Sequence, residues 1–248
     1  MVWSFFTMQR IVTLIRVILP FLVIFSIVSI SVGLTWVMFF VPDDIRHSNS
    51  VQIMFIHVPV AFMSSGMYII MALSSLSFLI WRHIAADLVA HNAAIVGGIS
   101  TFLTLITGSL WGKPMWGTLW VWDARLTSVL ILLFIYIGYM ALRSIIDSFV
   151  KRANISAVYC LVGVIMIPII RYSVYWWHTL HQKFSITFSG SDQLHNVYLY
   201  PLLLMIVSFY SIGLLLVIFG VRKDMMLYRG RFLRDKIMQQ KSREGQCQ

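Results

Sequence analysis

The sequence contains few charged residues. Asp, Glu, Lys and Arg make up 11% of it, against about 25% in a soluble globular domain. Hydrophobic residues make up 59%, and the mean hydropathy is +0.84. This composition excludes an ordinary soluble domain and predicts an all-α, polytopic membrane protein.

Several chemical signatures are absent as well. The two cysteines are far apart, Cys160 inside an apolar run and Cys247 beside the C-terminus, which argues against a disulfide, a Cys-x-x-Cys pair or a thiolate metal cluster. The sequence has no phosphate-binding Gly-x-x-x-x-Gly-Lys-Ser/Thr loop, no serine nucleophile elbow and no zinc-binding His-Glu-x-x-His helix. No carboxylate lies at the centre of an apolar run, which argues against a proton-coupled pump. We therefore expect a protein that is not an enzyme.

Six apolar runs reach the length of about 20 residues that is needed to cross a bilayer. They lie near residues 17–41, 54–81, 93–110, 127–146, 155–174 and 197–221. The first run is too long for a signal peptide and is interpreted as a retained span. Without an internal repeat or a long linker, residues 1–248 are expected to form a single membrane domain.

The basic residues are distributed unequally between the two sets of loops. Fourteen of the 19 lysines and arginines lie on the side that also holds both termini, and basic residues are retained on the cytoplasmic side. Both termini are therefore expected to be cytoplasmic, with residues 222–248 forming a basic cytoplasmic tail. We interpret the tail as an orientation signal and a contact to anionic lipid, and we expect no nucleic-acid partner because no nucleic-acid-binding motif accompanies the charge.

Residues 111–126, between the third and fourth runs, are the most distinctive stretch. Glycine and proline are expected to interrupt the helix there, and four indoles supply flat apolar surface with N–H donors at the rim. Lys113 adds a further positive charge. Such a stretch would suit a flat, hydrophobic, anionic ligand, and the candidate ligand-binding residues are Trp111, Gly112, Pro114, Trp116, Gly117, Trp120, Trp122, Asp123 and Arg125.

The histidines supply candidate ligands for a metal. His57 lies in the first turns of the second run, where burial of an ionisable group is costly. It is either a functional residue or a histidine that is hydrogen-bonded to a neighbouring carbonyl, and its position alone does not decide between the two. At the end of the fifth run, His178 and His181 would share a helix face if the helix continued, and spacing alone does not decide between them. His195 is a further candidate on that side, whereas His47, His83 and His91 are expected to be solvated loop residues.

Haem matches this combination of residues. It is a flat apolar macrocycle with two anionic propionates, and its iron accepts imidazole on both axial faces. Two imidazoles would complete the axial ligand set and leave no open position for oxygen chemistry. The residues therefore favour a protein that carries haem over one that catalyses a reaction with it.

The stretch from Trp111 to Thr127 closely resembles the tryptophan-rich WWD signature of haem-handling proteins in cytochrome c biogenesis. Within that superfamily the sequence is most similar to the cytochrome c maturation protein C family, as indicated by the six spans, His57-Val-Pro59 and Trp176-Trp-x-Thr-Leu-His181-Gln. The resemblance covers about residues 17–196. It implies that His57 and His181 are the axial ligands of a non-covalently bound haem b. The family commonly has asparagine where His178 stands.

The resemblance also implies partners and a location. The expected partners are a haem chaperone, the ATPase and membrane subunits of an ABC transporter, and a small single-span accessory protein. The expected location is the bacterial inner membrane with the haem site on the periplasmic side, the mitochondrial inner membrane being the alternative.

Two other functions stay open at the level of sequence. A haem-lyase subunit of a cytochrome c synthetase would carry additional spans and a long outer domain, which this sequence does not contain. A haem-free small-molecule transporter would need polar or broken helices at mid-membrane, and the sequence offers little of either.

Overall fold

The computed structural model describes residues 2–42, 51–181 and 195–245, and the regular structure in these ranges is entirely helical. His47, Lys183 and Cys247 lie outside them. The helices are α1 (Val2–Phe40), α2 (Val51–Trp81), α3 (Ile84–Trp116), α4 (Ala124–Ile145), α5 (Phe149–Gly163), α6 (Met166–Trp176) and α7 (Asn196–Gly245).

Six candidate spans are found in the described part of the chain, which confirms the predicted all-α membrane fold. They are Val12–Phe40, Val51–Trp81, Ile84–Trp116, Ala124–Ile145, Phe149–Trp176 and Asn196–Tyr228. The fifth span consists of α5 and α6 with a break at Val164 and Ile165. Pro168 accounts for the break, since it has no N–H to offer the carbonyl of Val164 and is best accommodated in the first turn of a new helix.

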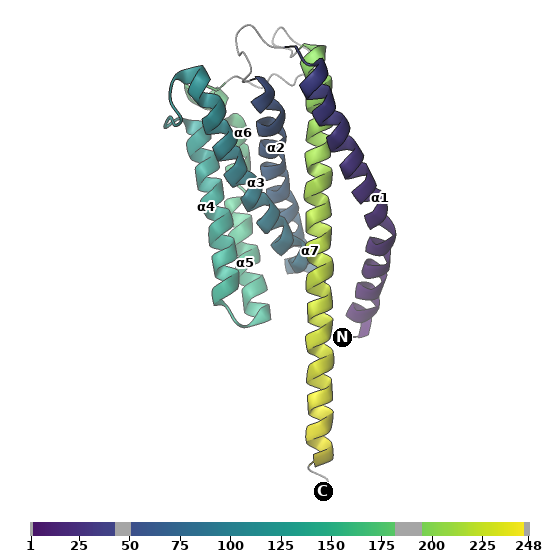
Figure 1. Ribbon diagram of the computed structural model, residues 1–248. Helices are drawn as coiled ribbons and strands as arrows, with labels where there is room; N and C mark the ends of the chain where they lie inside the picture. The colour runs from purple at the N-terminus through teal and green to yellow at the C-terminus, as the bar shows by residue number, and fades with distance from the viewer. Residues whose placement is uncertain (1, 43–50, 182–194, 246–248) are drawn as a thin grey trace.

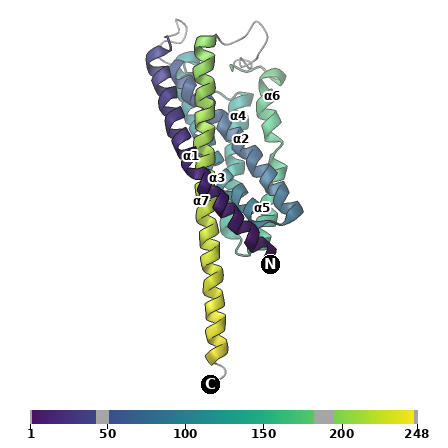
Figure 2. The same ribbon diagram turned by 90° about the vertical axis from the view of Figure 1, so that its right-hand side faces the viewer.

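Helices α2 and α3 form the centre of the bundle (Figure 1). Helices α4, α5 and α6 pack on one side of this pair, and α7 packs against α1, α2 and α3 on the other. Helix α1 contacts mainly α7, which it crosses (Figure 2). The start of α1 and the end of α7 lie at the same end of the molecule, as an even number of spans requires, and the α3–α4 connection lies at the opposite end. We call the latter the loop end.

Tyrosines and glycines bring the helices close together in the core. The hydroxyl of Tyr136 donates to the carbonyl of Ser64 at 2.9 Å, and a Cβ on Gly97 would stand only 2.2 Å from that hydroxyl. Tyr210 bonds the carbonyl of Phe62 at 2.7 Å in the same manner. Small residues allow such close approach, and hydrogen bonds between helices stabilise it where water is absent.

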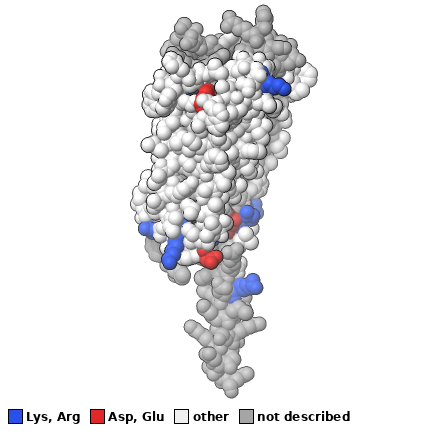
Figure 3. Space-filling view, turned by 90° about the vertical axis from the view of Figure 1, so that its left-hand side faces the viewer, with Lys and Arg blue, Asp and Glu red and all other residues white. Residues whose placement is uncertain are grey.

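Charged side chains lie at the two ends of the bundle. On the face shown in Figure 3, the surface between the ends carries neither acidic nor basic atoms, as a hydrocarbon environment requires. One ion pair is buried at the end opposite the loop end. There Arg143 of α4 donates from both terminal nitrogens to the two carboxylate oxygens of Asp87 of α3, at 2.6 and 2.9 Å. This bidentate pair joins α3 to α4.

Candidate functional site

Helix α3 continues into the tryptophan-rich stretch. The expectation that Gly112 and Pro114 interrupt the helix is wrong, because α3 ends only at Trp116. Pro114 lies in the last turn, where it removes a single helical hydrogen bond. Gly117 terminates the helix in the left-handed conformation, with φ 77°, and its N–H bonds the carbonyl of Lys113 at 2.9 Å.

The remainder of the stretch is a short loop that ends in a helix cap. Asp123 is the N-cap of α4, and its Oδ1 accepts a hydrogen bond from the backbone N–H of Leu126 at 2.7 Å. Asn, Asp, Ser and Thr are favoured at this position because they satisfy an unpaired helical donor. The loop therefore delivers a carboxylate to a fixed place at the start of α4.

His181 lies against this carboxylate. Its Nδ1 is 2.6 Å from Oδ2 of Asp123, and the two side chains are 17% and 6% exposed. The indole of Trp116 meets the imidazole edge-on, with 4.9 Å between ring centroids. The sequence singled out all three residues, and the structure brings them together.

The backbone around His181 is not helical, contrary to the arrangement considered from sequence. Helix α6 ends at Trp176, and Trp177 is extended with φ −126° and ψ 154°. His181 is held instead by a local turn, in which its N–H donates to the hydroxyl of Thr179 at 3.2 Å. His178 is exposed. Of the two histidines, His181 is the one that contacts Asp123.

His57 lies near the loop end of α2 and faces α3. Its Nδ1 is 3.0 Å from the hydroxyl of Thr107, and its ring centroid is 5.8 Å from that of Trp111. A Cβ added to Gly108 would stand 3.0 Å from Cε1 of the imidazole, so this glycine makes room for the ring. Both candidate histidines therefore contact a tryptophan of the same stretch, and both are anchored through Nδ1.

The charge of Asp123 follows from its surroundings. Burial raises the pKa of its carboxyl, but the hydrogen bonds from His181 and from the N–H of Leu126 lower it, so the pKa lies below its ordinary value. Asp123 is therefore ionised at neutral pH, and an ionised carboxylate can only accept hydrogen bonds.

Several buried donors near the loop lack partners. Nε1 of Trp111, Nε1 of Trp120 and Nε of Arg125 have no hydrogen-bond partner among the described residues, although buried polar groups normally have one. Trp120 packs edge-on against Trp122 at 5.5 Å, and Trp122 is 77% exposed. Two histidines whose described side-chain hydrogen bonds are made through Nδ1, together with apolar rings and the unpaired donors, fit a haem with its propionates. Among the described residues, no group of three or more His, Cys, Asp or Glu could hold a metal ion by itself.

Among the described residues, neither His195 nor His91 forms a hydrogen bond or a ring contact with this site. His195 is exposed and caps the start of α7, where its Nδ1 accepts from the N–H of Val197 at 3.4 Å. The expectation that His91 is a solvated loop residue is wrong, because α3 begins at Ile84 and His91 is half-buried within it.

Two residues beside His57 were not singled out from sequence. Thr107 and Gly108 precede Trp111 by four and three positions on α3, and residues at these spacings share a helix face. Their spacing from Trp111 is the sequence signal for these two residues. It becomes informative only once His57 is known to lie opposite this face of α3.

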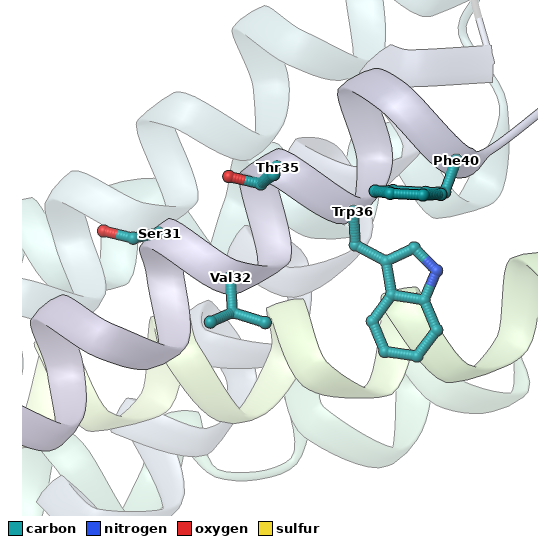
Figure 4. A pocket seen from close by; sticks show the side chains of 5 residues that line it. All are labelled: Ser31, Val32, Thr35, Trp36 and Phe40. Atoms are coloured by element: carbon teal, nitrogen blue, oxygen red, sulfur yellow. The ribbon is translucent and has the colours of Figure 1, made fainter.

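A separate groove of about 560 Å³ lies on α1 (Figure 4). Its lining residues are Ser31, Val32, Thr35, Trp36 and Phe40. None of them comes from α2, α3 or the α3–α4 loop, so this groove does not belong to the histidine site.

Known proteins are similar to this chain over most of its length. Residues 1–236 match the family model described as heme exporter protein C. The heme exporter protein C of Bradyrhizobium diazoefficiens is 44% identical over 216 residues, which are 87% of this chain and 82% of that protein. The one from Paracoccus denitrificans is 38% identical over 224 residues, 90% of this chain and 92% of that protein. A ccmC-like mitochondrial protein of cytochrome c biosynthesis from Marchantia polymorpha is 45% identical over 169 residues, 68% of this chain and 71% of that protein.

Proposed function

This chain belongs to the heme exporter protein C family, and on that premise we propose that it holds haem b non-covalently at the loop end and passes it to a haem chaperone during cytochrome c maturation. The names of its relatives support haem transport and cytochrome c biosynthesis. In this function the protein binds and releases its cargo, and makes no covalent bond to it.

One observation carries the proposal. His57 and His181 lie on different elements, each contacts a tryptophan of the same stretch, and each is anchored through Nδ1. In metal sites a histidine commonly donates its second ring N–H to a protein acceptor, which fixes the ring and leaves the other nitrogen for the metal. When bound, haem supplies an iron that takes one imidazole on each face.

The remaining residues have supporting roles. Apolar surface for the macrocycle would come from Trp116, Trp120 and Trp122. Trp111 packs against His57. Two basic residues would balance the propionate charges. Arg125 has a buried, unpaired Nε, and Lys113 is exposed. Gly112 and Pro114 shape the last turns of α3, and Gly117 ends it.

The protein would work in a bacterial inner membrane, with the loop end in the periplasm. Support comes from the basic residues that gather at the other end of the chain's spans and from the bacterial relatives. Its partners would be the haem chaperone, the ATPase and membrane subunits of an ABC transporter and a small single-span helper. The absence of a phosphate-binding loop from this sequence is compatible with a separate ATPase.

The test is a visible spectrum of the protein purified in detergent. Wild-type protein should carry six-coordinate, low-spin haem, and His57→Ala or His181→Ala should convert it to high spin or remove it. His178→Ala and His195→Ala are matched controls that should leave the spectrum unchanged. A spectrum that depends on His178 and not on His181 would refute the ligand assignment.

Reconstitution separates delivery from the lyase alternative. Protein with bound haem is mixed either with the haem chaperone or with an apocytochrome. Haem should appear on the chaperone. Covalent attachment to the apocytochrome without another subunit would assign the chain to the lyases.

A further inference from the structure

The two histidines differ in the group that accepts their Nδ1 proton. His181 faces a buried carboxylate of Asp123 at 2.6 Å, whereas His57 faces the hydroxyl of Thr107 at 3.0 Å. A hydroxyl can donate or accept, so the direction of the second hydrogen bond must be derived.

The hydroxyl of Thr107 has already committed its proton. It donates to the carbonyl of Leu103 at 2.7 Å, with a longer contact of 3.3 Å to the carbonyl of Thr104. A threonine hydroxyl has one proton and two lone pairs. Thr107 must therefore accept from His57, which places a proton on Nδ1 of His57 and leaves its Nε2 with a free lone pair.

Each oxygen of the Asp123 carboxylate lies in a hydrogen bond, Oδ1 with the N–H of Leu126 and Oδ2 with Nδ1 of His181. Because an ionised carboxylate can only accept, His181 also carries its proton on Nδ1. A hydrogen bond to an ionised acceptor is shorter and about twice as strong as a neutral one. A carboxylate partner also raises the basicity of the histidine as a ligand, to an extent that a neutral hydroxyl cannot.

Building on the haem-binding function above, we propose that the two axial ligands are unequal: Asp123 makes His181 the retained ligand, and Thr107 leaves His57 as the ligand that is released first when haem departs. Asp123 and Thr107 are positioning residues in this scheme. Nε2 of His57 leaves with its own lone pair, so its release requires no proton, oxidant or reductant.

The unequal strength of the two ligands would set the order in which they leave the iron. A partner that competes for the iron would displace His57 from the α2 side, while His181, Asp123 and Trp116 keep hold of the cargo. Loss of haem to a distant acceptor would then be governed by the bond to His181, which breaks last.

In the experiment, Asp123→Asn and Thr107→Val are each compared with the wild type in two measurements on the purified haem-bound protein. The first measurement is the rate at which carbon monoxide binds the reduced haem, because it requires one histidine to leave. The second is the rate of haem loss to excess apomyoglobin, because it requires both to leave. The midpoint potential of the haem is recorded as a third readout, because a general opening of the site to water would lower this potential, whereas a weaker donor at His181 should raise it.

Asp123→Asn should speed haem loss about 10- to 100-fold and raise the midpoint potential, because a neutral acceptor polarises the Nδ1–H bond less than a carboxylate does and so makes the imidazole of His181 a weaker donor to the iron. Asparagine is as good an N-cap as aspartate, so α4 should start normally in this variant. Carbon monoxide binding should change little. Thr107→Val should give the reverse pattern, with faster carbon monoxide binding, a nearly unchanged potential and a smaller effect on haem loss. Thr107→Ser keeps the hydroxyl and is the matched control.

The variants also separate this proposal from the function on which it rests. Wild-type protein without haem would refute the proposed function. Haem ligated by both histidines, but with equal responses to Asp123→Asn and Thr107→Val, would refute only the inequality. A faster carbon monoxide reaction in Asp123→Asn than in Thr107→Val would reverse the assignment of the two ligands.

Discussion

The imidazole of His181 and the carboxylate of Asp123 are joined across 58 positions of sequence by a contact of 2.6 Å. The same carboxylate caps α4 through its other oxygen. A single side chain thus terminates one helix and orients a histidine that follows another. Because the carboxylate is fixed as the N-cap at the end of the α3–α4 loop, the position of His181 depends on how this loop folds.

Gly108→Ala should disturb haem ligation by His57. The added Cβ would stand 3.0 Å from the imidazole, and overpacking of this kind costs about 1–3 kcal/mol. The expected result is a larger high-spin fraction in the visible spectrum at unchanged protein abundance. Gly230→Ala is a suitable control, because nothing lies within 4 Å of its added Cβ. An unchanged spectrum in Gly108→Ala would show that the ring is not confined there.

Gly117→Ala should destabilise the end of α3. The position has φ 77°, a conformation that costs a residue with a Cβ about 1–2 kcal/mol. No atom lies within 4 Å of the Cβ, so the penalty is conformational and not steric. Thermal unfolding in detergent should show a lower midpoint, together with a lower haem content per protein. Equal midpoints for variant and wild type would argue that the cap relaxes.

The tryptophans should differ in importance. Trp116 contacts His181, whereas Trp122 is 77% exposed. An aromatic contact contributes about 0.5–1.5 kcal/mol beyond area burial. Trp116→Ala should therefore reduce haem per protein more than Trp122→Ala, while membrane insertion stays intact. If the indoles served only as interfacial anchors, protein abundance would fall while haem per protein stayed constant.

The basic residues near the loop should respond differently to salt. Lys113 is exposed, and exposed ionic contacts contribute up to about 1 kcal/mol and are screened by salt. Lys113→Ala should weaken haem binding at low ionic strength and have no effect at high ionic strength. Arg125 has a buried, unpaired Nε, so Arg125→Ala should weaken binding at both. Haem titrations at two salt concentrations make the comparison.

Separating Arg143 from Asp87 should destabilise the bundle without altering the site. Removal of one partner leaves a buried charge uncompensated, at a cost of about 3–5 kcal/mol. Arg143→Met should therefore lower protein abundance and thermal stability, while the surviving protein keeps its haem spectrum. The double variant Arg143→Met/Asp87→Leu, which removes both charges of this pair, should regain much of the stability. Failure of the double variant to recover would point to a further role for the pair.

The spans were predictable because crossing a bilayer requires long apolar runs, and that requirement depends on local composition alone. The end of α3 could not be predicted in this way. Pro114 and Gly112 interrupt helices in general, but they are tolerated in the last turns of α3, where Trp116 packs over Gly112. The sequence predicts a loop around His91 for a similar reason. The polar residues at the start of α3 resemble a loop, although they are buried among neighbouring helices.

For the candidate site, the sequence predicts residue types and not the contacts between them. Histidines and tryptophans at one end of the spans indicate haem through their chemistry. The hydrogen bond from His181 to Asp123, and the place of Thr107 beside His57, depend on how separate helices pack. No local pattern reports such distances, so the positioning residues emerged only from the structure.

The hairpin of α3 and α4 is tied at both of its ends. The Asp87–Arg143 pair joins the helices at one end, and the tryptophan-rich loop joins them at the other. A clamp of this kind is preorganised, because the entropic cost of ordering the loop is met during folding and not when the ligand arrives. In the proposed function, opening of the site would therefore involve α2 and residues 177–181, which carry the two histidines, and not the α3–α4 hairpin.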